Sequence, residues 1–140
     1  AAGMADYIDA LYAHHFKNNA KPSERGKLVH NLQRSYEKEL SKPLLEFLSE
    51  RNDIRLLGPS DKNLKVPTIA IDVGKKAREY AKALGENGIM AGAGDFYAVR
   101  TLKSLGVNPD FGVLRLSFVH YTHKDDIAKL IEAIEKVIGS

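Results

Sequence analysis

Apolar residues recur at every fourth position through the first third of the chain, which predicts helices. Ile8, Leu11 and Tyr12 form one short apolar face. A longer face follows and consists of Leu28, Leu32, Tyr36, Leu40, Leu44 and Leu48. We expect Ser23 to cap this second helix. Pro43 should kink or split it near Leu40, because proline removes a backbone donor and crowds the preceding turn.

The remainder of the chain alternates short apolar runs with amphipathic segments. We predict strands at 54–57, 66–73, 89–91 and 113–119, and helices at 75–87 and 123–138. Gly92-Ala93-Gly94 is expected to be a loop, and Asp95 to cap a helix that runs to Leu105. Each amphipathic helix needs an apolar face of a sheet to bury its own. The predicted fold class is therefore α+β, a small and mostly antiparallel sheet covered by helices and preceded by a long helix.

Composition narrows the function classes. A chain of 140 residues with 44% hydrophobic residues suits one globular domain. The net charge of +3 is spread without a basic, aromatic-rich stripe, so no nucleic-acid partner is expected. The sequence contains no cysteine and therefore offers no thiolate ligand for a metal. No apolar run or leader pattern suggests a membrane, and a cytoplasmic protein is the expectation.

Arg115 is the residue with the strongest chemical implication. It lies within an apolar run, on the side opposite Leu114 and Leu116 if that run is a strand. A guanidinium is costly to bury unpaired, so Arg115 needs an anion. That anion is either a carboxylate of this chain or the carboxylate or phosphate of a ligand. The carboxylates available for a structural ion pair are those of Asp72, Asp95 and Asp110.

Other candidate residues have weaker signals. Gly92 and Gly94 would let a ligand approach the backbone, but a plain strand-to-helix turn explains them equally. Phe96 and Tyr97 suit packing at a helix start or a reach into a ligand site. The histidines lack the spacing of a metal site and no further ligands accompany them, so no metal is predicted. These histidines are His14, His15, His120 and His123.

Three segments resemble one family. The run Gly112-Val113-Leu114-Arg115-Leu116-Ser117-Phe118-Val119-His120-Tyr121-Thr122 resembles the carboxyl-terminal pattern of fold-type I, class V pyridoxal-phosphate enzymes, in the cysteine-desulfurase-like branch. Gly88 to Ala98 resembles the family's glycine-rich loop, and Lys65 to Ile71 its Arg-x-Pro-Thr strand. The resemblance covers about residues 30 to 138. This chain has Tyr121-Thr122 where the family commonly has Tyr-Asn-Thr.

The resemblance implies an aminotransferase small domain over 23–140, with 1–22 as a helical lead-in from a large domain that holds pyridoxal phosphate. Arg115 would then bind the substrate's α-carboxylate, with Gly92, Gly94, Phe96 and Tyr97 at the rim of the site. The cofactor lysine belongs to the large domain, so no catalytic residue and no bound cofactor are expected in this chain alone. Persulfide chemistry is excluded for this segment because it has no cysteine.

Two function classes remain open at this stage. The first is a fragment of a pyridoxal-phosphate enzyme that acts on a small amino acid as an aminotransferase, lyase or epimerase. The second is a stand-alone α+β module that binds a small anion or a partner protein without catalysis. The expected partners of the first are the large domain and the amino-acid substrate, and a homodimer is left open.

Overall fold

The computed structural model describes residues 2–61 and 63–139. Ala1, Lys62 and Ser140, which belong to the predicted ranges 1–22 and 23–140, lie outside the described residues. The elements follow in the order α1 (Ala2–His15), α2 (Pro22–Glu50), β1 (Arg55–Leu57), β2 (Thr68–Asp72), α3 (Ala77–Glu86), β3 (Gly92–Gly94), α4 (Val99–Ser104), β4 (Val113–Ser117) and α5 (Lys124–Ile138). No helix among the described residues is long and apolar enough to cross a membrane.

The strands form one sheet in the order β1-β2-β4-β3, with every neighbouring pair antiparallel. The longest pairing joins β2 to β4, where Thr68 lies opposite Ser117 and Ala70 opposite Arg115. This arrangement confirms the predicted α+β class with a small antiparallel sheet. β1, β2 and β4 each fall within the predicted strand ranges.

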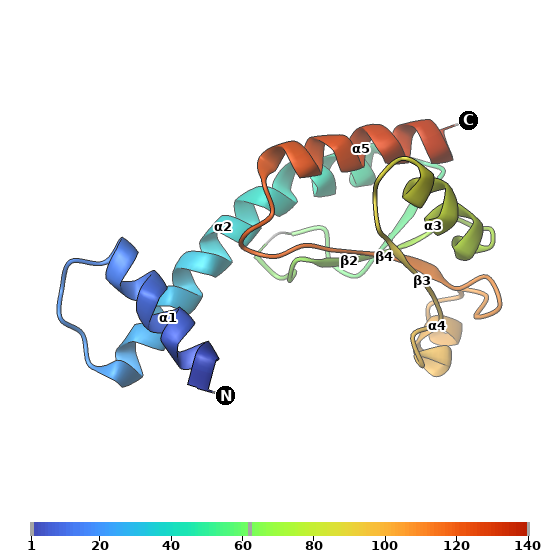
Figure 1. Cartoon of the computed structure of the whole chain (residues 1–140). Helices are drawn as coiled ribbons and strands as arrows, with labels where there is room; N and C mark the ends of the chain where they lie inside the picture. Colours follow the sequence, from blue (N-terminus) through green and yellow to red (C-terminus); the bar gives the residue numbers. More distant parts are fainter. Residues whose placement is uncertain (1, 62, 140) are drawn as a thin grey trace.

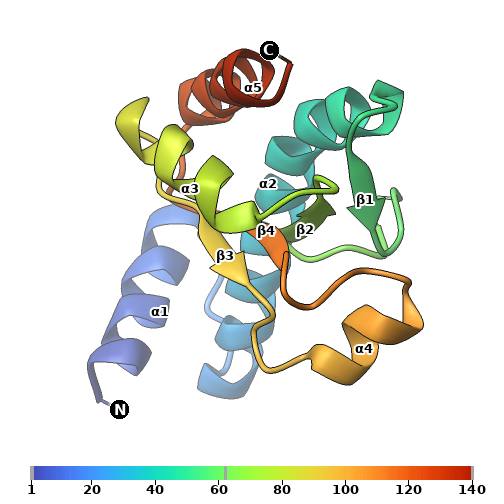
Figure 2. The same cartoon turned by 90° about the vertical axis from the view of Figure 1, so that its right-hand side faces the viewer.

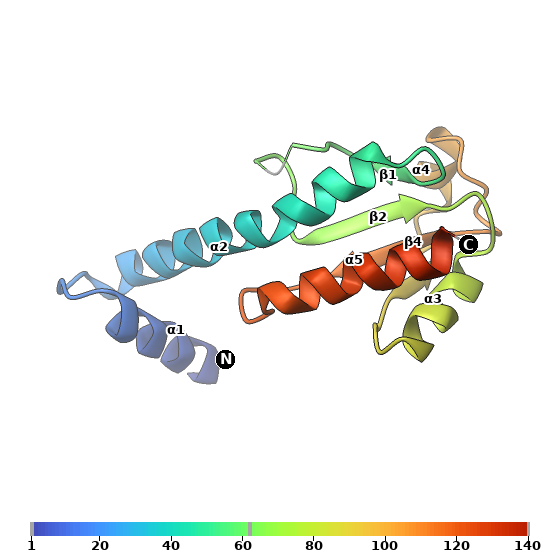
Figure 3. The same cartoon turned by 90° about the horizontal axis from the view of Figure 1, so that it is seen from above.

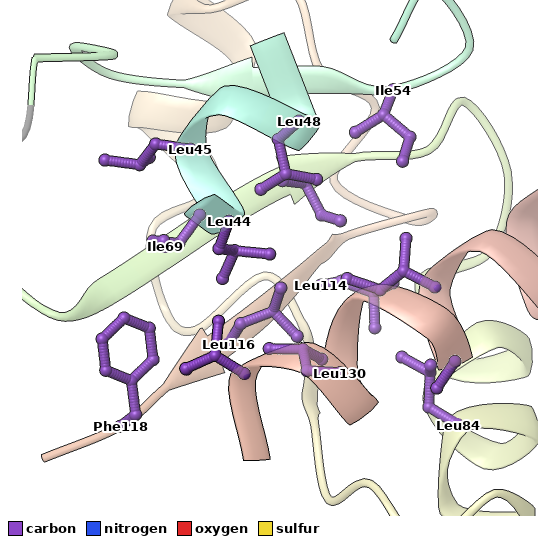
Figure 4. Packing of buried hydrophobic residues seen from close by; sticks show 14 of the residues in the cluster. Leu44, Leu45, Leu48, Ile54, Ile69, Leu84, Leu114, Leu116, Phe118 and Leu130 are labelled. Carbon is purple, nitrogen blue, oxygen red and sulfur yellow. The ribbon is translucent and has the colours of Figure 1, made fainter. Parts of the chain in front are cut away.

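One face of the sheet is covered by α2, α3 and α5, which lie above it in Figure 1. Leu44 and Leu48 of α2 pack with Ile69, Leu114 and Leu130 in the main core, shown in Figure 4. Leu44, Ile69 and Leu114 have no exposed surface. The predicted alternation of β4 is thus confirmed on its apolar side, since Leu114, Leu116 and Phe118 all belong to this core.

The opposite face of the sheet is only half covered. α4 lies on this side (Figures 1 and 2) and contributes Leu102 to a small cluster with Val107 and Val113. Thr68, Arg115 and Ser117 lie beyond this cluster and are exposed. We call this uncovered part, formed by the outward side chains of β2 and β4, the open face.

Helix α1 and the amino-terminal part of α2 extend away from the sheet as an arm, which is clearest in Figure 3, while the carboxyl-terminal part of α2 packs on the sheet. The buried Tyr12 of α1 secures the connection between the two helices. Its hydroxyl accepts a hydrogen bond from the Ala20 amide at 2.9 Å, and the Arg25 guanidinium lies over its ring. Tyr7 Oη and His120 Nε2 lie 2.7 Å apart and link α1 to the segment after β4.

The expected split of α2 at Pro43 and the expected Ser23 cap are both wrong. The helix runs without a break from Pro22 to Glu50, through Pro43. Pro43 lies on the exposed side, while Leu40 and Leu44 on either side of it are buried in one core, so packing outweighs the local cost of proline. The helix begins at Pro22 rather than after a Ser23 cap, because the fixed φ of proline suits the first helical position.

Two expectations about the segment before β4 are also wrong. The third strand is Gly92–Gly94, which was expected to be a loop, and not 89–91. Glycine is depleted in strands, so the Gly-Ala-Gly sequence did not predict a strand here. No helix begins at Asp95. Its carboxylate accepts a hydrogen bond from the Tyr97 amide at 3.3 Å and forms a turn, and α4 starts only at Val99.

Candidate functional site

Arg115 projects from the middle of β4 onto the open face. Its neighbours Leu114 and Leu116 point into the core, so strand alternation sends the guanidinium to the opposite side. The Arg115 side chain is exposed. Its guanidinium carbon lies 4.2 Å from the centre of the Phe96 ring, which is a close cation–π contact.

An unusual backbone turn brings Phe96 to this position. Phe96 and Tyr97 have φ values of 49° and 59°, so two successive non-glycine residues adopt the left-handed conformation. The hydrogen bond from the Tyr97 amide to the Asp95 carboxylate closes the turn. As a result Phe96 folds back over the sheet, whereas the Tyr97 side chain is fully exposed.

Gly92 makes room for this arrangement. Gly92 pairs with Arg115 across β3 and β4, and a Cβ at Gly92 would lie 3.2 Å from Cζ of the Phe96 ring. Gly94 pairs with Val113, and its backbone touches Gly112. The structure therefore brings together Arg115, Gly92 and Phe96, with Gly94 one pair further along the strands.

The structural ion pair considered for Arg115 is not formed. Asp72 pairs instead with Arg55 of β1, at 3.1 Å between Nη2 and Oδ2. Within residues 2–61 and 63–139, no carboxylate lies within ion-pair distance of Arg115, and this includes Asp95 and Asp110. The aromatic ring occupies one face of the guanidinium, and the N–H donors lie in the guanidinium plane, where a carboxylate binds.

A hollow of about 470 Å³ lies next to Gly94, at the start of α3. Its charged lining consists of Lys76, Arg78, Glu79, Asp95 and Asp110. Three carboxylates against two cations leave it with a net negative charge. The hollow therefore does not suit a phosphate group, and the phosphate of pyridoxal phosphate in particular.

Lys65 is also unsuited to be the lysine that binds the cofactor. Burial lowers the pKa of its amine, which would favour nucleophilic chemistry. The amine, however, donates hydrogen bonds to the carbonyl oxygens of Leu57 at 2.8 Å and Pro59 at 3.1 Å. The hollow beside it measures only about 80 Å³. Lys65 thus holds the turn after β1, and neither its small hollow nor the acidic hollow beside Gly94 fits pyridoxal phosphate.

His120 and His123 have structural contacts. His120 meets Tyr7, and His123 Nδ1 accepts a hydrogen bond from the Asp125 amide at the start of α5. In the described part of the chain, histidine and carboxylate side chains form no group that could hold a metal ion.

Sequence reasoning missed how Phe96 is used. Its aromatic ring suggested helix-start packing, because Asp95 looked like a helix cap. The two glycines that flank Ala93 were the available signal, since they mark a place where another group approaches the backbone closely.

Comparison with known proteins supports one family. Residues 27–130 match the family described as Aminotransferase class-V. The "Aminotransferase-like protein FGM3" of Gibberella zeae is 30% identical over 109 residues, which are 74% of this chain and 27% of that protein. The cysteine desulfurase CsdA from Escherichia coli is 27% identical with a TM-score of 0.63, over 76% of this chain and 25% of that chain.

A further solved structure supports the fold. The apo cysteine desulfurase from Thermococcus onnurineus NA1 matches with a TM-score of 0.71 at 22% identity, over 84% of this chain and 29% of that chain. The present chain thus spans about a quarter of the length of these relatives.

Proposed function

Since this chain belongs to the class-V aminotransferase family, we propose that it is the carboxyl-terminal small domain of a pyridoxal-phosphate-dependent enzyme that acts on a small amino acid. In this proposal a large domain supplies the cofactor and its lysine, and Arg115 binds the substrate's α-carboxylate. Gly92, Gly94, Phe96 and Tyr97 form the rim around it. The reaction is a transamination, a lyase reaction or an epimerisation.

The observation that carries the proposal is that Arg115 is exposed and forms no ion pair with the described residues. It is an exposed cation on an otherwise uncharged strand, and none of the described carboxylates pairs with it. An arginine in this position offers a planar, bidentate donor set to an incoming carboxylate. The helices described in the structure leave the open face around it uncovered, so a second domain has room to close over the bound substrate.

The proposal assigns the cofactor to the other domain for a physical reason. The hollow beside Gly94 is lined by an excess of carboxylates, and the Lys65 amine is engaged with two carbonyl oxygens. The excess of carboxylates disfavours a phosphate in that hollow, and the hydrogen bonds of Lys65 disfavour imine formation at its amine. What the open face can supply is recognition of the amino acid.

The test is the substitution Arg115→Lys in the enzyme assembled with its large domain. Lysine keeps the charge but loses the planar fork, which should cost about 1.5–3 kcal/mol of transition-state binding. Catalytic efficiency with small amino acids should fall roughly tenfold to hundredfold, while cofactor binding stays intact.

Arg55→Lys is the matched control, because Arg55 lies on β1 at the edge of the same sheet and is already paired with Asp72. Its kinetics should match those of the unsubstituted enzyme. Unchanged kinetics in Arg115→Lys would refute the carboxylate role. Tight binding of a partner protein with no turnover of any amino acid would favour the non-catalytic module instead.

A further inference from the structure

An exposed arginine has many rotamers, and one that must receive a ligand gains from being held in a single orientation. On the open face, Ser117 follows Arg115 along β4 and Thr68 lies opposite Ser117 on β2, and neither provides a charge to orient Arg115. The contact that restricts Arg115 is with the Phe96 ring, whose centre lies 4.2 Å from the guanidinium carbon.

We propose that Phe96 is a positioning residue whose ring holds the Arg115 guanidinium in the orientation that receives the substrate carboxylate. This inference rests on the carboxylate role proposed above. Stacking uses the face of the guanidinium and leaves its in-plane N–H donors free. The ring therefore reduces the freedom of Arg115 without competing for the donors that a carboxylate needs.

The surrounding backbone is built for this contact. The sequence from Asp95 to Leu105 is typical of a capped helix. In such a helix Phe96 and Tyr97 would have negative φ values. Instead the chain makes two successive left-handed residues, which persist only where the surrounding structure favours them. The consequence of that turn is the position of the Phe96 ring above Gly92 and beside Arg115.

Gly92 provides an independent sign of the same design. A Cβ at this position would lie 3.2 Å from Phe96 Cζ and 3.7 Å from Arg115 Cβ. Absence of a side chain here lets the ring approach the strand next to the arginine. Phe96 also packs against the apolar cluster of Leu102, Val107 and Val113. If filling space were its only role, contact with this cluster would be enough, and its ring would not need to lie over Arg115.

The experiment separates these two roles by the choice of substitution. Phe96→Leu keeps an apolar side chain for the cluster and removes the aromatic face, whereas Phe96→Tyr keeps the face. Phe47→Leu is the control, because Phe47 forms a comparable stack with Arg51, 5.5 Å from the ring centre, outside the open face.

The kinetic readout uses the enzyme assembled with its large domain. Phe96→Leu should raise KM for small amino acids about two- to fivefold, the value of an exposed cation–π contact, with kcat little changed. Phe96→Tyr should restore KM, and Phe47→Leu should leave it unchanged. A fall in kcat alone, or an equal effect of Phe47→Leu, would overturn the inference.

A second readout does not depend on activity. The Nε–Hε resonance of Arg115 in a ¹⁵N-arginine-labelled sample should move downfield in Phe96→Leu, since the shielding of the ring is lost, and return in Phe96→Tyr. If Phe96→Leu does not fold, Gly92→Ala displaces the same ring and should move the same resonance. An unmoved resonance in the folded variants would overturn the inference.

The two proposals fail in different ways. An Arg115→Lys enzyme with unchanged kinetics removes the carboxylate role itself. An impaired Arg115→Lys enzyme together with a normal Phe96→Leu enzyme leaves that role standing and removes only the positioning role of Phe96.

Discussion

Gly112 and Gly94 lie back to back where β3 runs beside the start of β4. A Cβ at Gly112 would lie 2.7 Å from Cα of Gly94 and 2.6 Å from its carbonyl carbon, closer than such atoms can approach. Gly112 also has a φ of 65°, in the left-handed region. The pairing of β3 with β4, and with it the place of Gly92 beside Arg115, therefore depends on a missing side chain.

We expect Gly112→Ala to lower the free energy of unfolding by about 2–4 kcal/mol, from backbone strain together with overpacking. Urea denaturation followed by circular dichroism measures this. Gly85→Ala is the matched control, since Gly85 lies in α3 with no atom near its added Cβ. That variant should be about 0.5–1 kcal/mol more stable. Equal stability of the two variants would contradict the close approach of β3 and β4.

Asp53 should make the free energy of unfolding fall at acid pH. Hydrogen bonds from the Arg51 guanidinium, one of them 2.7 Å from Nε to Oδ1, lower the pKa of the Asp53 carboxyl below its ordinary 3.8. A lowered folded-state pKa gives stability that is present above the unfolded value and is lost as pH falls through the folded one. The loss should therefore occur below about pH 4.

The pair is partly exposed, so the Asp53 contribution should be at most about 1 kcal/mol and should shrink in high salt. The measurement is the urea midpoint between pH 2.5 and pH 7. Asp53→Asn should flatten the acid end of this profile, and Arg51→Met should flatten it in the same way. A profile that keeps its full acid step in both variants would show that the loss comes from other carboxyls.

Pyridoxal phosphate added to this 140-residue chain should give no stable adduct at one lysine. The Lys65 amine is engaged by two carbonyl oxygens, and Lys76 lines a hollow that also holds three carboxylates. The measurement is absorbance of the mixture, followed by borohydride reduction and mass spectrometry of the peptides. Scattered, substoichiometric labelling is the expected result. Stoichiometric labelling of a single lysine would contradict it and would place the cofactor in this domain.

The fold class and most of the elements were predictable from the sequence. Each of α2, α3, α5 and β4 buries one face. Burial of one face places apolar residues at a regular spacing, and this spacing can be read from the sequence of the segment alone. Arg115 stood out for the same reason, because a cation inside an apolar strand breaks the pattern. Its placement on the face opposite Leu114 and Leu116 follows from strand geometry alone.

Other features were decided only by the tertiary structure. The strand at Gly92–Gly94 has no strand-like composition. Its close approach to β4 and to the Phe96 ring is possible because Gly112 and Gly92 have no side chains. α2 continues through Pro43 because the leucines around it share one core. Phe96 lies over Arg115 through a left-handed turn that local propensity disfavours. Such contacts join residues distant in the sequence, and their free energy exceeds the local preferences that a sequence displays.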